Sequence, residues 1–557
     1  MKRIKENLSD QGILFSNHYV GDRLSKDDEV YLYNSLIDKL DISSIVNSYS
    51  SEGGSMFSPR DQLSVILYAF HKGITSSVQI AQLIRSDLRF IYLSGGHIIK
   101  RRTICDFRLK HREGIRKIFE SSVDLALGTG VVRDDILFAV DGSKIEAHAS
   151  FSKTRKKFEW KQRQEKIVEH VDNFLREWEE QDEREEGLEE KKREEFEKVK
   201  KKLDAIKGKR ENKNSDQKGD NSDRDAKEKG DAISHRRGQG KGSAVVNKRE
   251  SKAVYKKNKL VIKKFEDAGR FLGEYEDIDS LLEEYNKADD KMHLSLTDPD
   301  CRIMQSDSIT KECYNVQAIS NNQVIVAVDV TQDENDQYQL EPMVEQLKNN
   351  IDIEGRKIKF AGDAGYNRGK NLSYIDQEDN IDAYISMFDR REEKDLENNK
   401  FHKENFVFDE EDDSWECPTG ERLVFIKEYI SNGKKYTQYG CELKKCVFCQ
   451  HRDTCITTKA DARRGYRTID DDGYVIYRRE MKEKMSHKTA KEIYSQRAGA
   501  IEPVFGQIKN NRNFTRFRLR GLSKVKTEFL TMVIAHNIGK IMKYVNGNKM
   551  NLLHEAY

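Results

Sequence analysis

Two short apolar runs, each ending at an aspartate next to a glycine, constrain the fold of this chain most. Residues 136–140 precede Asp141 and Gly142, and the run in KIKFAGDAGY ends at Asp363. Runs of this length are typical of buried strands that stop at a turn. If the two strands are neighbours, both carboxylates lie at one edge of a sheet, where ligands bind. Asp-Gly and Gly-Asp are also ordinary turn sequences, so a third acid is needed before the pair indicates a site.

Strand and helix patterns alternate between and after these runs. CYNVQAIS and QVIVAVDVTQ predict two strands joined by a hairpin at Asn321-Asn322. QLEPMVEQLKNNI and residues 367–376 predict helices, and IDAYISM predicts a fifth strand. This order predicts the α/β class, with a mixed sheet and helices on its faces, and it is the order of the ribonuclease H-like fold.

The residues before the first strand predict only helices. SPRDQLSVILYAFHKG has Ser58 as a predicted N-cap and Pro59 at the first helical position. SSVQIAQLIRSDLRFIYLSGG and RRTICDFRLKHREGIRKIFESSVDLAL predict one helix each. Short helices with basic flanks are typical of a helix-turn-helix unit, and a plain helical bundle is the alternative. We therefore expect residues 1–129 to form an all-α N-terminal domain that contacts DNA.

Two stretches of different composition interrupt the α/β pattern. Residues 153–289 form a charged insertion: KIVEHVDNFLREWEEQDEREEGLEEKKREEFEKVKKKL predicts a charged helix, and KGKRENKNSDQKGDNSDRDAKEKG has too few apolar residues to fold alone. Residues 389–487 form a second insertion, which is rich in cysteine. The α/β core is then expected in three pieces, 130–152, 290–388 and 488–545.

The third acid is Glu502, in the helical pattern YSQRAGAIEPVFGQIKNNRNFTRFRLRG. Ile501 and Val504 belong to its apolar stripe, while Glu502 points away from that stripe. A surface glutamate is the plain alternative. Basic residues interleaved with Phe514 and Phe517 suit phosphates and base or sugar contacts. The basic candidates for DNA binding are Arg497, Lys509, Arg512, Arg516, Arg518 and Arg520.

The motifs AVDGSKIEAHAS, YNVQAI, FAGDAGYN and RAGAIEPVFGQIK resemble those of bacterial insertion-sequence transposases of the DDE type, in the insertion-sequence 4/5/1182 group. The resemblance covers most of the chain outside the charged insertion. It implies a ribonuclease H-like catalytic core and a DNA transposase that cuts and joins DNA at the ends of a mobile element. It also implies that Asp141, Asp363 and Glu502 are the catalytic residues and hold two Mg²⁺ or Mn²⁺ ions.

The resemblance extends to the residues around Glu502. Part of this family groups a tyrosine, an arginine, the glutamate and a lysine on one helix, and Tyr494, Arg497 and Lys509 match that set. The gap between Arg497 and Glu502 is one residue longer than in the family's set. The match adds Tyr494 to the candidate DNA-binding residues.

Carboxylates suit the chemistry that the resemblance implies. Mg²⁺ prefers carboxylate oxygens. Two ions roughly 4 Å apart activate a water or a 3′-hydroxyl and stabilise the departing oxygen. A nuclease that hydrolyses DNA without strand transfer would need the same three acids, and so would a silent DNA-binding protein descended from a transposase. The sequence leaves these alternatives open.

Five of the eight cysteines lie close together in the second insertion. CELKKCVFCQHRDTC has the spacing C-x4-C-x2-C-x5-C, which suits tetrahedral Zn²⁺. Reduced cysteines packed inside a small subdomain are the alternative. The candidate zinc ligands are Cys417, Cys441, Cys446, Cys449 and Cys455.

The composition bears on partners and location. Lys and Arg number 99 and Asp and Glu 97, so any DNA-binding surface must be local rather than a property of the whole chain. No apolar run reaches the roughly 18 residues of a membrane span, and the first residues lack the apolar core of a signal peptide. We expect a cytoplasmic, nucleoid-associated protein that binds double-stranded DNA, does not bind a membrane, and acts as a homo-oligomer, a dimer in the synaptic complex.

Overall fold

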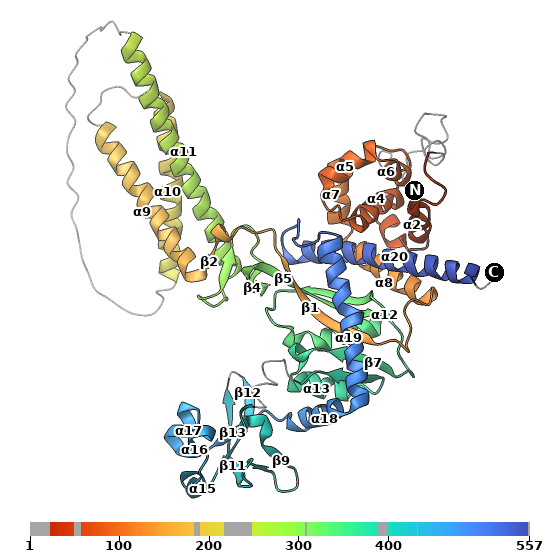
Figure 1. Cartoon of the computed structure of the whole chain (residues 1–557). Coiled ribbons are helices and arrows are strands. Elements are labelled where there is room, and N and C mark those ends of the chain that lie inside the picture. The colour runs from red at the N-terminus through yellow and green to blue at the C-terminus, as the bar shows by residue number, and fades with distance from the viewer. Residues whose placement is uncertain are drawn as a thin grey trace. The chain divides into compact units, whose positions relative to one another are not determined.

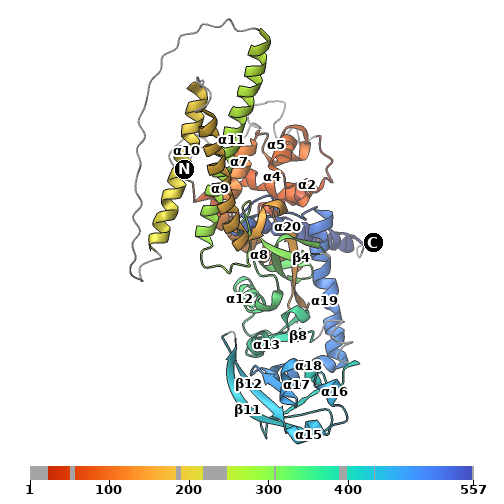
Figure 2. The same ribbon diagram turned by 90° about the vertical axis from the view of Figure 1, so that its left-hand side faces the viewer.

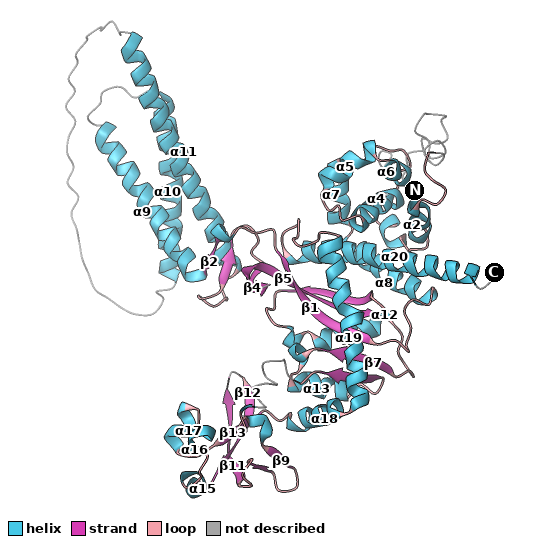
Figure 3. Cartoon of the chain, viewed as in Figure 1, coloured by secondary structure: helices cyan, strands magenta, loops and turns pink. Residues whose placement is uncertain are grey.

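A computed structural model gives a mixed α/β molecule (Figures 1 and 3). It consists of two compact units, Met1–Ala149 with Asp300–Tyr557, and Ser150–Pro299. No helix in the described part is long and apolar enough to cross a membrane. The structure describes residues 23–49, 57–182, 190–216, 248–306, 309–387, 398–431 and 433–554.

A six-stranded mixed sheet forms the centre of the first unit. β5 pairs with β1 antiparallel, β7 pairs with β1 parallel, and β8 pairs with β7 parallel. β6 and β4 are both antiparallel partners of β5. Five of the strands therefore lie in the order β6-β5-β1-β7-β8. The strands are β1 (Phe138–Glu146), β4 (Arg302–Ser306), β5 (Ile309–Asn321), β6 (Val324–Thr331), β7 (Ile358–Gly362) and β8 (Ile381–Ile385).

Most of the predicted strands are confirmed, but the end of the first strand is wrong. β7 ends at Gly362, immediately before Asp363, as predicted. The hairpin between β5 and β6 turns at Asn322 and Gln323, whose φ angles of 48° and 64° suit a tight turn. β1, however, runs past Asp141 to Glu146, because residues 142–146 pair along β5. Cross-strand pairing thus overrides the Asp-Gly turn signal.

Helices cover the sheet. α12 (Leu340–Asn350) and α13 (Gly369–Asp376) match the two predicted helices. α19 (Lys488–Gly506) contacts β1, β5 and β8, and a π-helical turn follows it. α20 (Leu522–His554) contacts β6 and the N-terminal helices (Figure 1). Asn537 of α20 pairs with the backbone of β6 through its amide, so this helix is fixed to the sheet edge.

The described residues before β1 form helices, with two more breaks than predicted. Ser58 caps α4 by accepting a hydrogen bond from the Asp61 amide, as predicted. One of the predicted helices is divided at Asp87, because the Asp87 carboxylate caps a new helix. Another ends at His111, where a new helix begins. The helices are α2 (Glu29–Ile37), α3 (Ser43–Val46), α4 (Pro59–His71), α5 (Ser77–Ser86), α6 (Leu88–Leu93), α7 (Arg101–Lys110) and α8 (Arg112–Gly128).

The second unit is a bundle of three long helices, α9 (Lys157–Asp182), α10 (Glu190–Asp216) and α11 (Lys248–Glu284), which lie side by side (Figures 1 and 2). The single charged helix that was predicted is thus two helices. α11 completes an apolar core that includes Trp160, Val171 and Leu272. The sequence predicted to be unable to fold alone enters α10 as far as Asp216, and its remainder lies outside the described residues.

The cysteine-rich subdomain (residues 398–487) contains a five-stranded sheet of order β13-β12-β11-β10-β9. Short helices follow β12, and α18 leads to α19. The strands are β9 (Val407–Asp409), β10 (Ser414–Glu416), β11 (Arg422–Ser431), β12 (Lys434–Cys441) and β13 (Thr468–Asp471); the helices are α15 (Leu443–Val447), α16 (Arg452–Cys455), α17 (Lys459–Arg464) and α18 (Val475–Ser486).

Candidate active site

Asp141 and Asp363 lie next to each other in the central sheet. β1 and β7 are parallel neighbours, and Ala139 is in register with Ala361. Two residues further along each chain are Asp141 and Asp363, so the two aspartates lie at the same level of the sheet. The structure therefore brings together two of the three predicted acids, as their adjacent strands require.

Arg497 of α19 joins the two aspartates. Its Nη2 atom lies 3.2 Å from Oδ2 of Asp141 and 3.7 Å from Oδ2 of Asp363. The Arg497 side chain is only 10% exposed, so this charge is held inside the site. The sequence indicated DNA binding for Arg497, whereas its position in this structure makes it the counter-charge of the two carboxylates.

The electrostatics show that the two carboxylates are crowded. Burial raises the pKa of Asp141 to about 6; Arg497 opposes that rise, and the charge of Asp363 adds to it. Burial also raises the pKa of Asp363, again against the effect of Arg497. Buried carboxylates that repel each other gain from a nearby cation. The donor set of this pair, two carboxylates on adjacent strands, fits a hard divalent ion.

A further acid, Asp336, lies beside the pair, and sequence reasoning missed it. Its Oδ1 accepts hydrogen bonds from Asn315 Nδ2 at 2.7 Å and from Gln317 Nε2 at 2.6 Å. Its charge also raises the pKa of both Asp141 and Asp363. The signal that could have found it is its place in QDENDQY, soon after the third predicted strand.

Gly142 leaves room for this arrangement. A Cβ atom at Gly142 would lie 2.4 Å from Asp336 Oδ1 and 2.4 Å from Gln317 Nε2. Any larger residue would displace these polar groups. The glycine after Asp141 is therefore explained by close packing within the strand rather than by a turn.

Glu502 lies on α19 with its side chain exposed. The predicted apolar stripe of this helix is confirmed, since Ile501 and Val504 are buried. Five positions along an α-helix correspond to a rotation of about 140°, so Glu502 and Arg497 are on different sides of α19. Within the described residues no three His, Cys, Asp or Glu side chains form a group that could hold a metal ion. The structure thus does not gather Glu502 with the two aspartates.

Tyr494 lies one turn before Arg497 on α19. It packs among Leu137, Ala361 and Tyr384, and it forms a side-chain hydrogen bond with Ser386. Burial raises the pKa of its hydroxyl group. Tyr494 therefore belongs to the wall of the site, beside the two aspartates.

The basic segment after α19 is mostly engaged inside the protein. Arg512 is buried, with Nη1 3.4 Å from His536 Nδ1, and burial lowers its pKa. Arg516 donates to the carbonyl oxygen of Ala147 at 3.0 Å and to that of Ala149 at 2.7 Å. These arginines fix the segment to the end of β1 and to α20 rather than extending into solvent.

The other basic residues of this segment, Lys509, Arg518 and Arg520, differ in how exposed their side chains are. Arg520 donates to the carbonyl oxygen of His148 at 3.0 Å. Arg518 is exposed, and its side chain forms no hydrogen bond or ion pair with any described residue. Lys509 is half-buried, near Cys313, where burial raises the thiol pKa to about 11 and the lysine opposes that rise. Of the arginines at the predicted DNA-binding positions, Arg518 is the one whose side chain makes no hydrogen bond or ion pair with a described residue.

Phe514 and Phe517 are not accessible for the predicted base or sugar contacts. Both rings are buried, and they pack edge-on against each other with their centroids 5.4 Å apart. Phe529 of α20 packs against both rings. The prediction is wrong because α20 covers this segment.

The five cysteines of the candidate zinc site are close neighbours. Burial raises the pKa of the Cys441 thiol to about 12, and a hydrogen bond with Cys446 adds to that rise. Burial raises the pKa of Cys455 to about 11, and the charges of Cys446, Cys417 and Cys449 add to it. The thiols are free, and all of them except that of Cys449 belong to the apolar core of the subdomain or pack against it. Their chemistry fits zinc, while no three described side chains are gathered as a metal site here.

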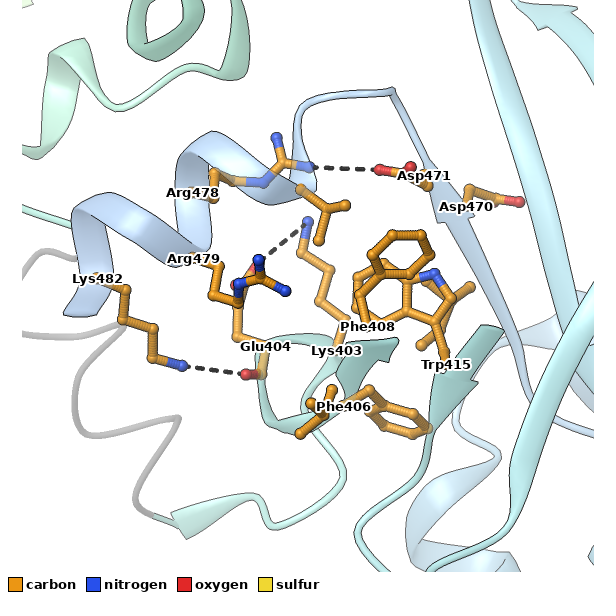
Figure 4. Close-up of a pocket in the computed structure, with 13 residues that line it drawn as sticks. Lys403, Glu404, Phe406, Phe408, Trp415, Asp470, Asp471, Arg478, Arg479 and Lys482 are labelled. Atoms are coloured by element: carbon orange, nitrogen blue, oxygen red, sulfur yellow. Dashed lines mark hydrogen bonds and ion pairs between the residues drawn. The ribbon is translucent and has the colours of Figure 1, made fainter. Parts of the chain in front are cut away.

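A cavity of about 170 Å³ separates the sheet of the cysteine-rich subdomain from α18 (Figure 4). Phe406, Phe408 and Trp415 line its apolar side, and basic side chains of α18 line the other. Lys482 donates a hydrogen bond to the carbonyl oxygen of Glu404 at 3.1 Å. No predicted site residue lines this cavity. Its contacts attach α18 to the sheet of the subdomain, and α18 leads to the helix that carries Arg497.

Comparison with protein families finds two transposase domains in the chain. The family Transposase DDE domain matches residues 416–542, which include α19 and begin after both aspartates. The family Transposase domain (DUF772) matches residues 18–110, which include the N-terminal helices to α7. No curated protein and no solved structure matches the chain. The two matches do not show to which group of insertion-sequence transposases the chain is similar. Together, the two family matches indicate an insertion-sequence transposase of the DDE type.

Proposed function

We propose that this protein binds the terminal repeats of a mobile element and catalyses metal-dependent cleavage and transfer of DNA strands. The observation that carries the proposal is the pairing of Asp141 with Asp363 on adjacent parallel strands, in contact with Arg497. The transposase family at residues 416–542 supports the reaction class. The resemblance of the sequence motifs to DDE transposases supports the roles of the two aspartates.

Asp141, Asp363 and Glu502 would hold two Mg²⁺ or Mn²⁺ ions, which supply an activated water or 3′-hydroxyl and stabilise the departing oxygen when bound. Arg497 offsets part of the negative charge of the two aspartates and keeps both carboxylates in place. Tyr494 and Ser386 close the wall of the site behind Arg497. Glu502 joins the site through a rotation or bending of the end of α19, which Pro503 and the following π-helical turn favour.

The fold supports the same function. The order β6-β5-β1-β7-β8, with three antiparallel strands and two parallel ones, supports a ribonuclease H-like catalytic core. We assign residues 1–129 to an all-α DNA-binding domain, because the described part is helical and carries a transposase family match. The partner is double-stranded DNA at the element ends and the target, and a homodimer brings two ends together at the nucleoid.

Cleavage of a labelled duplex that carries the element's own ends tests the proposal. Wild type and Asp363→Asn are compared in Mg²⁺ and in EDTA. Loss of a group that merely supports a metal ligand costs about 10- to 100-fold in activity or affinity, so loss of a direct ligand should cost at least that much. Joined products distinguish a transposase from a hydrolytic nuclease. Duplex binding by wild type without cutting in any metal would instead show a silent DNA-binding protein.

A further inference from the structure

A cavity of about 280 Å³ lies where the N-terminal helices meet the basic segment after α19. It is lined by residues 75–78 at the start of α5, by Arg101, Cys105 and Arg108 of α7, and by Arg518 and Leu519. Arg101, Cys105 and Arg108 fall on one face of α7, since seven residues complete about two helical turns. Three guanidinium groups from two distant parts of the sequence therefore converge on one cavity.

The first turn of α5 adds a second source of positive potential. The N-cap residue Ser76 makes no side-chain hydrogen bond to this turn, so the amide groups there are not capped by it. Uncapped amides and the helix dipole together attract anions. The Ser77 hydroxyl is 3.1 Å from the Cys105 thiol, which ties the start of α5 to α7. The cavity thus combines helix amides with fixed positive charge.

Arg108 shows that the cavity is built for a polar ligand. Its side chain is only 5% exposed and lies 3.1 Å from Glu528 through Nη2, while Nε has no hydrogen-bond partner in the described structure. Glu528 also accepts hydrogen bonds from the amides of Arg518 and Leu519, which positions both residues at the cavity. The hydrogen-bonding capacity of this guanidinium is thus incompletely used, which is costly for a buried charge and favours an anion in the cavity that Arg108 lines.

The positive charge of the cavity is not neutralised from within. Glu528 offsets Arg108, but Arg101 and Arg518 are exposed and form no ion pair with a described residue. Arg102, the neighbour of Arg101, points elsewhere and pairs with Asp106 at 3.7 Å. Two uncompensated arginines at one cavity suit an anion with several acceptor oxygens.

We propose that this cavity binds a phosphate group of the DNA backbone and so holds the duplex against both the N-terminal helices and the segment after α19. The inference rests on the proposed function, since it takes duplex DNA to be the ligand. A backbone phosphate positions DNA without reading its sequence. The contact should therefore contribute equally to the element's ends and to unrelated DNA.

The test is the salt dependence of duplex binding by the full-length protein. Wild type, the double variant Arg101→Gln/Arg518→Gln and the matched control Arg102→Gln are titrated with element-end and unrelated duplexes at several salt concentrations. Each lost phosphate contact should reduce the slope of log K against log salt by about 0.9. We expect this loss in the double variant on both duplexes, and an unchanged slope in the control.

The outcomes separate this inference from the proposed function. Wild type that fails to bind any duplex overturns the proposed function, and the phosphate site with it. Wild type that binds, with the same slope in the double variant as in Arg102→Gln, overturns the phosphate site alone. Titration with inorganic phosphate checks for a free-ion site: phosphate binding that the double variant loses, with no change in the DNA slope, also overturns the assignment to DNA. Circular dichroism confirms that each exposed substitution leaves the protein folded.

Discussion

A single guanidinium group lies between two half-buried carboxylates that would otherwise repel each other. Arg497 contacts both Asp141 and Asp363, and their raised pKa values show that burial acts more strongly than this one counter-charge. A buried charge that loses its partner is strongly destabilising. Under the proposed function a metal ion would share these carboxylates with Arg497, whose contacts hold the two aspartates together in this structure.

Glu502 and Asp336 are two candidates for the third acid, and single substitutions separate them. Glu502→Gln should abolish cleavage with little change in stability, because this exposed side chain loses no interior contact. Asp336→Ala should lower the free energy of unfolding by about 1–3 kcal/mol, because the buried amides of Asn315 and Gln317 lose their acceptor. Urea unfolding and the cleavage assay measure the two effects.

The opposite result would change the assignment of the site. Cleavage that survives in Glu502→Gln removes Glu502 from the catalytic residues. Loss of cleavage in Asp336→Asn, with normal unfolding and with Glu502→Gln still active, would make Asp336 the third acid. Glu492→Gln, a substitution of another exposed glutamate on α19, is the matched control and should leave both measurements unchanged.

Elements that follow from a local sequence pattern were predictable. Features that depend on pairing with a distant strand, or on burial under a distant helix, were not. The apolar run before Asp363 was sufficient to place β7, and the stripe around Ile501 was sufficient to predict α19. The continuation of β1 through Gly142 depends on β5, which no local pattern reveals. The burial of Phe514 depends on α20. The role of Arg497 depends on how α19 is rotated against the sheet, and spacing alone does not determine that rotation.

The cysteine-rich subdomain gives a prediction about metal content. If its thiols bind zinc, protein purified under reducing conditions should carry about one zinc ion per chain, and Cys446→Ser should lose it. Cys105→Ser, a substitution on α7 outside this subdomain, is the control and should retain zinc. Metal analysis of the denatured protein measures this. Zinc-free wild type that is folded would mean that the cysteines serve the apolar core, where the structure places them.

At the scale of the whole molecule, the chain leaves the first unit at Ala149 and returns to it at Asp300. The two ends of the intervening unit are held together by its own backbone: β2 (Thr154–Lys156) pairs antiparallel with β3 (His293–Ser295), and Ser150 donates to Thr297 Oγ1 at 3.1 Å. The helices between these strands have a separate apolar core. An insertion with adjacent ends and its own core is expected to fold independently of the chain that carries it.

Replacing residues 157–292 with Asn-Gly tests this independence. A two-residue linker is sufficient because Lys156 and His293 are paired across two antiparallel strands, which a two-residue turn can join. Leu294→Thr is included, since this buried side chain would otherwise lose its apolar partners. We expect the shortened protein to melt cooperatively, within a few degrees of the corresponding transition of the full chain. Removal of α11 alone is the contrasting variant: it takes Phe265, Leu272 and Ile278 out of the bundle core, so α9 and α10 should lose their helical signal. A shortened protein that aggregates or melts without cooperativity would show instead that the fold of the first unit depends on the inserted helices.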